Sequence, residues 1–273
     1  MTSLVRSLRS FHRRRIEIPV GPDDLVLDIG SGDKPHWRAD VLLDRYLGAD
    51  HAGQRSGRSA ARVSRPLFDA DAAAMPFADG AFDYVVCSHI LEHVPDPAGV
   101  VAEMARVASA GYIEVPEAAS AKILDFPSHL WWCRLDGGTL VMTAKDAPAF
   151  DPEIQRYIRD AGIERQLADL LDDDFDRRIV SVRWKGRPDV RVEGRPAPDL
   201  VDAALAAGSH HRVGQDAVAR ALTWVMTVPR RRQRRRRPIL LDDVLRPELR
   251  TGSGEPLARR VYRYGASTGL STG

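Results

Sequence analysis

The chain has 273 residues, of which 44% are apolar and 29% charged, and its formal net charge at pH 7 is +2. This composition is typical of a globular protein with a full core, and no apolar run approaches the roughly 20 residues of a membrane-spanning helix. Cys87 and Cys133 lie in apolar surroundings without metal-ligand spacing, which argues against a disulfide framework. The basic N-terminus lacks the apolar stretch of a secretory signal, so we expect a cytoplasmic protein.

Positive charge is concentrated at the C-terminal end. Residues 229–273 hold 12 arginines against 4 acidic residues, and a run that begins at Arg230 and ends at Arg237 is interrupted only by Gln233. Such a run is usually solvated, so we expect residues 229–273 to be an arginine-rich flexible tail. A weak contact of this run with an anionic membrane or with nucleic acid is the alternative.

Short apolar runs between turn residues predict the strands of a sheet. Residues 24–30, 39–44, 82–88 and 111–115 are too short for helices and are bounded by turn signals. Residues 97–107 carry Val and Met at helical spacing after Pro97, so a strand, a helix and a strand follow one another. This order predicts a right-handed crossover in a parallel sheet.

The later segments are also mixed in secondary structure. We expect helices within residues 151–171, 199–207 and 215–227, and two strands within 178–192. The predicted fold class is α/β, a doubly wound, Rossmann-like and mostly parallel sheet with C-terminal α/β additions. We divide the chain into a basic N-terminal segment (1–20), a catalytic domain (21–195), a helical extension (196–228) and the tail.

A glycine turn follows the first predicted strand, with the sequence Asp28-Ile29-Gly30-Ser31-Gly32. Ligands of open α/β sheets bind at this position, although the two glycines are equally consistent with a tight turn that binds nothing. The dinucleotide fingerprint requires a glycine at position 35, where Pro35 stands. A nicotinamide or flavin enzyme is therefore disfavoured.

Three motifs in order resemble class I S-adenosylmethionine-dependent methyltransferases. VLDIGSG (26–32) is similar to the first motif of that family, DAAAMPFADGAFD (71–83) to the segment that leads into its fourth strand, and HILEHVPDP (89–97) to its next helix entry. The resemblance covers about residues 24–116. It implies binding of S-adenosyl-L-methionine and in-line transfer of its methyl group to a small-molecule or glycan-type acceptor.

The resemblance also implies roles for single residues on the cofactor side. The backbone of Gly30, Ser31 and Gly32 would face the methionine part of the cofactor, and Asp28 would fix the loop or reach the amino group. Asp44, with Asp50 as the second candidate, would accept both ribose hydroxyls, since one carboxylate can accept two hydrogen bonds.

The second motif implies the adenine contacts. Asp71 and the Ala72 backbone would bind the adenine edge, and Met75 would pack near the base. The sequence departs from the family pattern at Lys34, which replaces the third motif glycine, and in the short distance from Gly32 to Asp44. We therefore expect a shortened first helix.

Catalytic candidates follow the third predicted strand. His89, Glu92 and His93 share one face if a helix begins there. His89 or His93 could act as a general base, or the three could be structural. A divalent metal is a further alternative, since some quinone-pathway O-methyltransferases carry E-x-x-E-H here, but His89 in place of the first Glu weakens it, and we assign no metal ligand.

A second group of candidates, His129, Trp131 and Trp132, follows the fourth predicted strand. Tryptophan faces suit stacking on a sugar or aromatic acceptor, and packing in the core explains them equally well. The competing function is a non-catalytic binding or scaffold protein on a methyltransferase fold, tethered through the arginine tail. Fold alone does not decide between the two functions.

Overall fold

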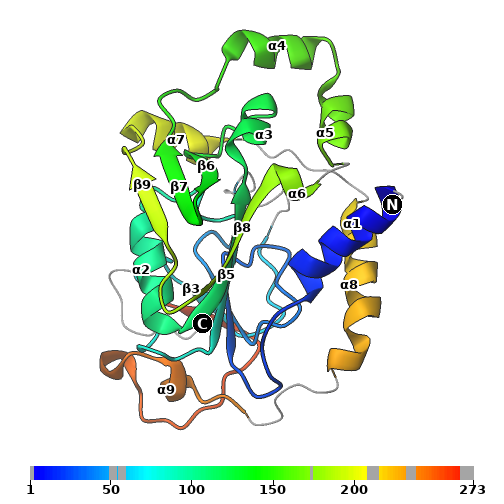
Figure 1. The fold of residues 1–273 in the computed structure, drawn as a ribbon. Helices are drawn as coiled ribbons and strands as arrows, with labels where there is room; N and C mark the ends of the chain where they lie inside the picture. The colour runs from blue at the N-terminus through cyan, green and yellow to red at the C-terminus, as the bar shows by residue number, and fades with distance from the viewer. Residues whose placement is uncertain are drawn as a thin grey trace.

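The computed structural model describes residues 3–48, 54, 60–172, 175–207, 215–231 and 238–264. Its centre is a sheet with helices around it (Figure 1). The sheet has seven strands in the order β10-β3-β2-β1-β4-β5-β8. Every neighbouring pair is parallel except β5 with β8. The strands are β1 (Val26–Ile29), β2 (Val41–Asp44), β3 (Leu67–Asp69), β4 (Tyr84–Ser88), β5 (Ala110–Pro116), β8 (Ile179–Lys185) and β10 (Val261–Arg263). The predicted doubly wound α/β fold is confirmed.

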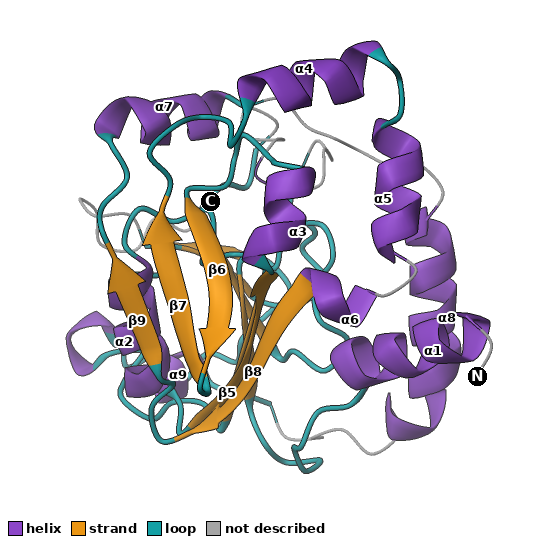
Figure 2. Cartoon of the chain, turned by 45° about the horizontal axis from the view of Figure 1, so that its top comes forward, coloured by secondary structure: helices purple, strands orange, loops and turns teal. Residues whose placement is uncertain are grey.

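A second sheet of three strands packs beside the first, in the order β6-β7-β9 (Figure 2). It comprises β6 (Trp131–Asp136), β7 (Thr139–Ala144) and β9 (Val190–Glu193). Gly137 and Gly138 join β6 to β7 with φ of +56° and +98°, a turn that favours glycine. Strands β6 and β7, which lie between β5 and β8 in the chain, were not among the predicted strands.

The helix predicted at residues 97–107 is present as α2 (Pro97–Val107), whose first turn is capped by the Asp96 side chain. The pattern at 151–171 forms two helices, which Gly162 separates with a φ of +66°. The other helices are α1 (Ser3–Phe11), η1 (His12–Ile16), α3 (Ala118–Ile123), α4 (Pro152–Asp160), α5 (Glu164–Asp172), α6 (Phe175–Arg178), α7 (Pro198–Ala206), α8 (Gln215–Arg231), α9 (Leu241–Val244) and η3 (Pro247–Leu249). In the part of the chain that the structure describes, no helix has the length and apolarity to cross a membrane.

The link from β1 to β2 contains turns only, so the expected shortened first helix is absent from residues 30–40. Side chains fix the backbone of this link instead. Asp28 accepts a hydrogen bond from the His36 backbone N–H at 2.7 Å, and Arg38 donates to Asp40 at 2.6 Å and to the Asp24 carbonyl at 2.7 Å. Side chains that bind the backbone in this way compete with helix formation.

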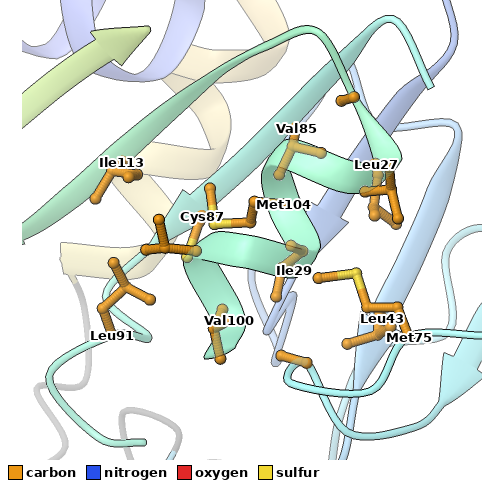
Figure 3. Packing of buried hydrophobic residues seen from close by; sticks show 14 of the residues in the cluster. Leu27, Ile29, Leu43, Met75, Val85, Cys87, Leu91, Val100, Met104 and Ile113 are labelled. Atoms are coloured by element: carbon orange, nitrogen blue, oxygen red, sulfur yellow. The ribbon is translucent and has the colours of Figure 1, made fainter. Parts of the chain in front are cut away.

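One face of the sheet packs against α2 (Figure 3). Leu27, Ile29 and Cys87 from β1 and β4 meet Val100 and Met104 from the helix, and all five are at most 1% exposed. Burying each large side chain contributes roughly 1.5–3 kcal/mol to folding. Cys87 and Cys133 are both buried and unbridged, which confirms that they are core thiols.

The N-terminal segment covers part of the opposite face. Val26, Tyr84 and Val86 pack there against Ile18 and Val20. Helix α8 lies beside α1 and η1 (Figures 1 and 2), and Arg230 donates to the Ile16 carbonyl at 3.2 Å. Residues 3–20 therefore belong to the folded domain, not to a separate segment.

The C-terminal region is folded where the structure describes it, so a flexible tail from residue 229 onward is wrong for residues 238–264. Strand β10 pairs with β3, and Tyr262 stacks on Phe68 with ring centroids 5.0 Å apart. Leu241 and Val244 of α9 are buried as well, because apolar residues alternate with the charged ones in this segment. Residues 232–237 of the arginine run lie outside the described residues, and a membrane or nucleic-acid contact there stays a prediction.

Candidate functional site

A cavity of about 620 Å³ opens at the carboxyl ends of β1, β2, β4 and β5. The strand order reverses between β1 and β4, and this switch point is where open α/β sheets bind ligands. The cavity is lined by most of the predicted site residues, namely Asp28, Gly30, Ser31, Gly32, Asp44, Asp71, Ala72, His89, His93 and His129. The structure thus brings the predicted cofactor residues and the three histidines into one space.

The glycine turn is held against β2. Gly30 has a φ of +62°, and its N–H donates to the Leu43 carbonyl at 2.7 Å, while Gly32 donates to Asp44 Oδ2 at 2.8 Å. A Cβ on Gly30 would lie 1.9 Å from the Ile90 Cδ1 atom, so Ile90 would have to move, and the left-handed backbone itself favours glycine. The buried Ser31 Oγ has no hydrogen-bond partner, and it is a free polar atom that this wall of the cavity offers to a ligand.

Two buried carboxylates lie beside this turn. Burial raises the pKa of Asp28 to about 7, although the His36 N–H and the charge of Arg15 oppose the shift. Asp44 accepts the N–H groups of Gly32 and Tyr46 at 2.8 and 2.9 Å. Asp50, the second candidate for the ribose contact, lies outside the described residues.

The adenine-side residues differ in position. Asp71 is half exposed at the rim, where it pairs with Arg45 at 2.5 Å and accepts the Ala73 N–H at 2.9 Å. Ala72 lines the cavity. Met75 does not line it, because its side chain is fully buried beside Leu43 in the core (Figure 3). The structure therefore does not bring Met75 to the cavity, and its contact with a base stays a prediction.

His89 follows β4 in a loop, not in a helix, and its φ of +58° is left-handed. Its Nδ1 and Nε2 atoms lie 3.1 Å from Glu92 and Glu114 oxygens. Burial opposes a charge on the ring, but the hydrogen bonds to Glu114 and Glu92 raise the pKa of His89 to about 9. Both ring nitrogens of His89 thus face carboxylates, which favours the protonated ring and leaves neither nitrogen open as a general base in this arrangement.

Sequence reasoning missed Glu114, which lies within β5 and is 1% exposed. Arg14 donates two hydrogen bonds to it, at 2.7 and 2.9 Å, and the Tyr112 hydroxyl donates a third. Although burial opposes ionisation, His89 and Arg14 hold the pKa of Glu114 well below its usual range. The sequence did offer one signal for Glu114, because a single Glu within an apolar strand needs a buried partner. Nothing in the neighbouring sequence indicated that this partner would be Arg14.

His93 and His129 form the far wall of the cavity, with ring centroids 4.8 Å apart. His93 Nδ1 lies 2.9 Å from the Ser128 carbonyl oxygen and must carry the hydrogen to bond it. Burial lowers the pKa of His93 and, more strongly, that of His129. Burial thus favours the neutral form of both rings, in which His93 Nε2 presents a lone pair.

Glu92, His93 and His129 each offer one ligand atom, and these atoms lie within 4.8 Å of one another. The cluster differs from the predicted trio, because His129 takes the place of His89.

The two tryptophans do not line the cavity, so their predicted contact with an acceptor is wrong. Trp131 is 3% exposed in the core, and its Nε1–H donates to the Val94 carbonyl at 2.8 Å. Trp132 packs over Lys145, whose Nζ lies 4.6 Å from the ring centroid. Of this group only His129 reaches the site.

The fold and the cavity define the class of protein: a Rossmann-like α/β domain with a ligand site at its topological switch point, next to a glycine turn and two buried carboxylates. Residues 27–113 match the family described as "Methyltransferase domain". This part of the chain is thus similar to a methyltransferase domain, in agreement with the resemblance that the sequence motifs indicated.

Curated relatives are each similar to about one third of the chain. An uncharacterized methyltransferase of Mycobacterium sp. (strain KMS) is 36% identical over 33% of this chain and 36% of its own length. A demethylmenaquinone methyltransferase of Renibacterium salmoninarum is 37% identical over 36% of this chain and 44% of its own length. The chain thus spans less than half the length of these relatives.

Among solved structures, an S-adenosylmethionine-dependent methyltransferase from Mesorhizobium loti is 17% identical, with a TM-score of 0.34. The comparison covers 67% of this chain and 98% of that one.

Proposed function

We propose that the chain is an S-adenosyl-L-methionine-dependent methyltransferase that acts on a small-molecule or glycan-type acceptor. The observation that carries the proposal is the single cavity that joins the methyltransferase-like residues 27–113 to a second group of residues around His129. Such a cavity can place a methyl donor and an acceptor side by side, which is the main requirement of an in-line displacement.

The cofactor end of the cavity fits the cofactor's chemistry. The cavity volume of about 620 Å³ is that of an ordinary small-molecule site. Asp28 and Asp44 offer carboxylates suited to a cationic amino group and a ribose diol, and Ser31 Oγ lacks a partner of its own. When bound, S-adenosyl-L-methionine supplies a methyl group on a good leaving group.

The acceptor end is built from residues beyond the matched segment, including Phe126, Ser128, His129 and Phe175. Aromatic faces with a few polar atoms suit a ring-shaped acceptor that carries a hydroxyl group. His93 Nε2, with its free lone pair, is placed to accept the proton that such an acceptor loses. His89 cannot accept it, because both ring nitrogens are engaged by carboxylates.

Calorimetric titration with S-adenosyl-L-methionine and with its demethylated product tests the proposal. We expect saturable binding by the wild type that Asp44→Ala weakens about 10–100-fold, as loss of hydrogen bonds to a charged group implies. Asp71→Ala should weaken binding less, because Asp71 lies at the half-exposed rim. Asp199→Asn, an exposed carboxylate of α7 outside the cavity, should bind as the wild type does.

The outcome that would remove the proposal is the absence of binding by a wild-type protein that unfolds cooperatively and is therefore folded. That result would favour the scaffold function instead.

A further inference from the structure

A cluster of three side chains at the acceptor end of the cavity is not explained by methyl transfer alone. Glu92, His93 and His129 each direct one ligand atom to within 4.8 Å of the other two. Glu92 is fully buried, His129 is 6% exposed, and all three line the cavity. Among the described residues this is the one group of three or more His, Cys, Asp or Glu side chains with metal-binding spacing.

Two atoms of the cluster are buried without a hydrogen-bond partner. They are Glu92 Oε2 and His129 Nδ1. An unsatisfied buried carboxylate oxygen is costly, so each such atom in a folded protein requires an explanation. A bound cation would satisfy both atoms, since a carboxylate oxygen and a neutral imidazole nitrogen are both electron-pair donors.

Neighbouring groups fix the orientation of the three side chains. The His93 Nδ1–H donates to the Ser128 carbonyl at 2.9 Å, which turns Nε2 toward the cluster, 4.0 Å from Glu92 Oε1. The His89 ring donates to Glu92 Oε1 at 3.1 Å and leaves Oε2 free. Metal-binding histidines typically donate a hydrogen bond from their other ring nitrogen to a carbonyl, and metal-binding carboxylates typically accept a hydrogen bond from a neighbour. His93 and Glu92 show this pattern.

Backbone hydrogen bonds also hold together the two loops that carry the cluster. The Leu130 N–H donates to the Glu92 carbonyl at 2.7 Å, and the His129 N–H donates to the Phe126 carbonyl at 2.9 Å. The loop after β4 and the loop before β6 are thereby fixed to one another, although they lie more than 30 positions apart. A three-ligand site requires such a fixed pair of loops.

We propose that Glu92, His93 and His129 bind a divalent transition-metal ion, with Zn²⁺ as the best match. Two imidazoles and one carboxylate are a ligand set of zinc sites that keep an open position, whereas Mg²⁺ and Ca²⁺ prefer oxygen ligands only. A tetrahedral ion with ligands at about 2.1 Å holds them roughly 3.4 Å apart. The ligand atoms, which lie up to 4.8 Å apart, must therefore close by at most about 1.4 Å around the ion, within the reach of small side-chain rotations.

The metal site depends only on these side chains, but its consequence for the acceptor rests on the proposed function. The open position faces the cavity, so the acceptor would be an alcohol or phenol whose oxygen completes the coordination. Coordination lowers the pKa of that hydroxyl. Because the ion would occupy the His93 Nε2 lone pair that otherwise accepts the proton, the hydroxyl proton would pass to water. The new O–CH₃ bond would form as the S–CH₃ bond breaks, and the electron pair of the broken bond would stay on sulfur.

Metal binding by the purified, chelator-stripped chain tests the site. We expect Zn²⁺ to bind at one equivalent in calorimetry, and Co²⁺ to give the strong visible absorption of a site with few ligands. His129→Gln and Glu92→Gln should each weaken Zn²⁺ binding by more than the roughly 10–100-fold that loss of a supporting residue costs. His12→Gln, in η1 outside the cavity, should bind as the wild type does.

Thermal unfolding controls for folding and gives a second readout. Zn²⁺ should raise the Tm of the wild type and of His12→Gln, and should not raise that of His129→Gln. Equal Zn²⁺ affinity in the wild type and in His129→Gln, or no binding by the folded wild type, would overturn the metal site.

Titration of the same preparations with S-adenosyl-L-methionine separates the two proposals. Zn²⁺ binding without cofactor binding would support the metal site and remove methyl transfer. Cofactor binding without Zn²⁺ binding would remove the metal site alone.

Discussion

The cofactor end and the acceptor end of the cavity differ in how far apart along the chain their residues lie. The cofactor end uses Gly30, Ser31 and Asp44, which fall within 15 positions. The acceptor end joins Arg14, His129 and Phe175, which come from the N-terminus, from a loop and from α6. Arg14 is held in turn by Glu114 of the strand β5. A local motif can therefore specify the first end, whereas only tertiary packing specifies the second.

The largest expected effect is the loss of stability on substituting Glu114, which holds Arg14 at the acceptor end. Glu114→Gln removes the charge that compensates the buried guanidinium of Arg14, whose side chain is 8% exposed. Leaving a buried charge without its partner typically costs about 3–5 kcal/mol, so the free energy of unfolding in urea should fall by that amount. Glu248→Gln, an exposed residue of η3, is the matched control and should leave the midpoint unchanged. An equal, small effect of both variants would show that the acceptor end is not held together by this charge cluster.

The next effect concerns the cofactor end and compares two glycines with the same φ. Gly30 and Gly80 both have a φ of +62°, but a Cβ on Gly30 meets Ile90 at 1.9 Å, whereas a Cβ on Gly80 meets nothing within 4 Å. Gly80→Ala should lower the free energy of unfolding by about 1–2 kcal/mol through the left-handed backbone alone. Gly30→Ala should lower it by about 1–3 kcal/mol more, through overpacking. Gly30→Ala should also weaken cofactor binding in calorimetry, and Gly80→Ala should not. Equal losses in both variants would mean that Ile90 yields to the added methyl group.

A smaller effect is the pH dependence of cofactor binding through Asp28. Because burial raises the pKa of Asp28 from 3.8 to about 7, its carboxyl is largely protonated below pH 7. The ionised form should bind the cationic amino group of the cofactor, so affinity should rise about tenfold from pH 6 to pH 8 and binding should release a proton. Arg15 and Asp44 are the charged neighbours that act on Asp28, in opposite directions. The stability of the protein without ligand has the opposite pH dependence. Because the pKa of Asp28 is raised in the folded protein, this residue lowers the free energy of unfolding as the pH rises from about 4 to 7.

Calorimetry across this pH range, in buffers of different ionisation enthalpy, measures both the affinity and the proton release. Asp28→Asn should give a flat profile. A wild-type profile that is equally flat would show that the carboxylate does not interact with the cofactor's charge.

Particular elements show why sequence reasoning succeeded at one end and failed at the other. The strands β1, β2, β4 and β5 and the helix α2 were predicted because each buries a continuous or periodic apolar pattern. Strands β3 and β10 were missed, because three residues carry no usable period and their pairing joins segments nearly 200 positions apart.

In the site, too, the residues that follow local patterns were predicted, and those that depend on distant segments were not. The glycine turn and Asp44 follow directly from strand ends, and the structure places them in the cavity as predicted. The surroundings of His89 were not predicted, because Glu114 reaches it from another strand and because its left-handed backbone replaces the helix that was assumed. The two tryptophans were misplaced since their segment forms β6, which alternates between core and surface.

The smallest expected effect on the site is that of substituting Trp132. This substitution tests whether the wall of the acceptor end includes, beyond His129, any residue of β6. Trp132 covers the buried pair of Lys145 and Asp125, whose charged atoms are 2.8 Å apart. Trp132→Leu should therefore lower the free energy of unfolding by about 0.5–2 kcal/mol, through the lost cation–π contact. Cofactor affinity and Zn²⁺ affinity should stay within twofold of the wild type, because the ring lies outside the cavity. A large loss of either affinity would mean that the wall of the acceptor end extends into β6. The acceptor end would then depend on more segments of the chain than those that line the cavity.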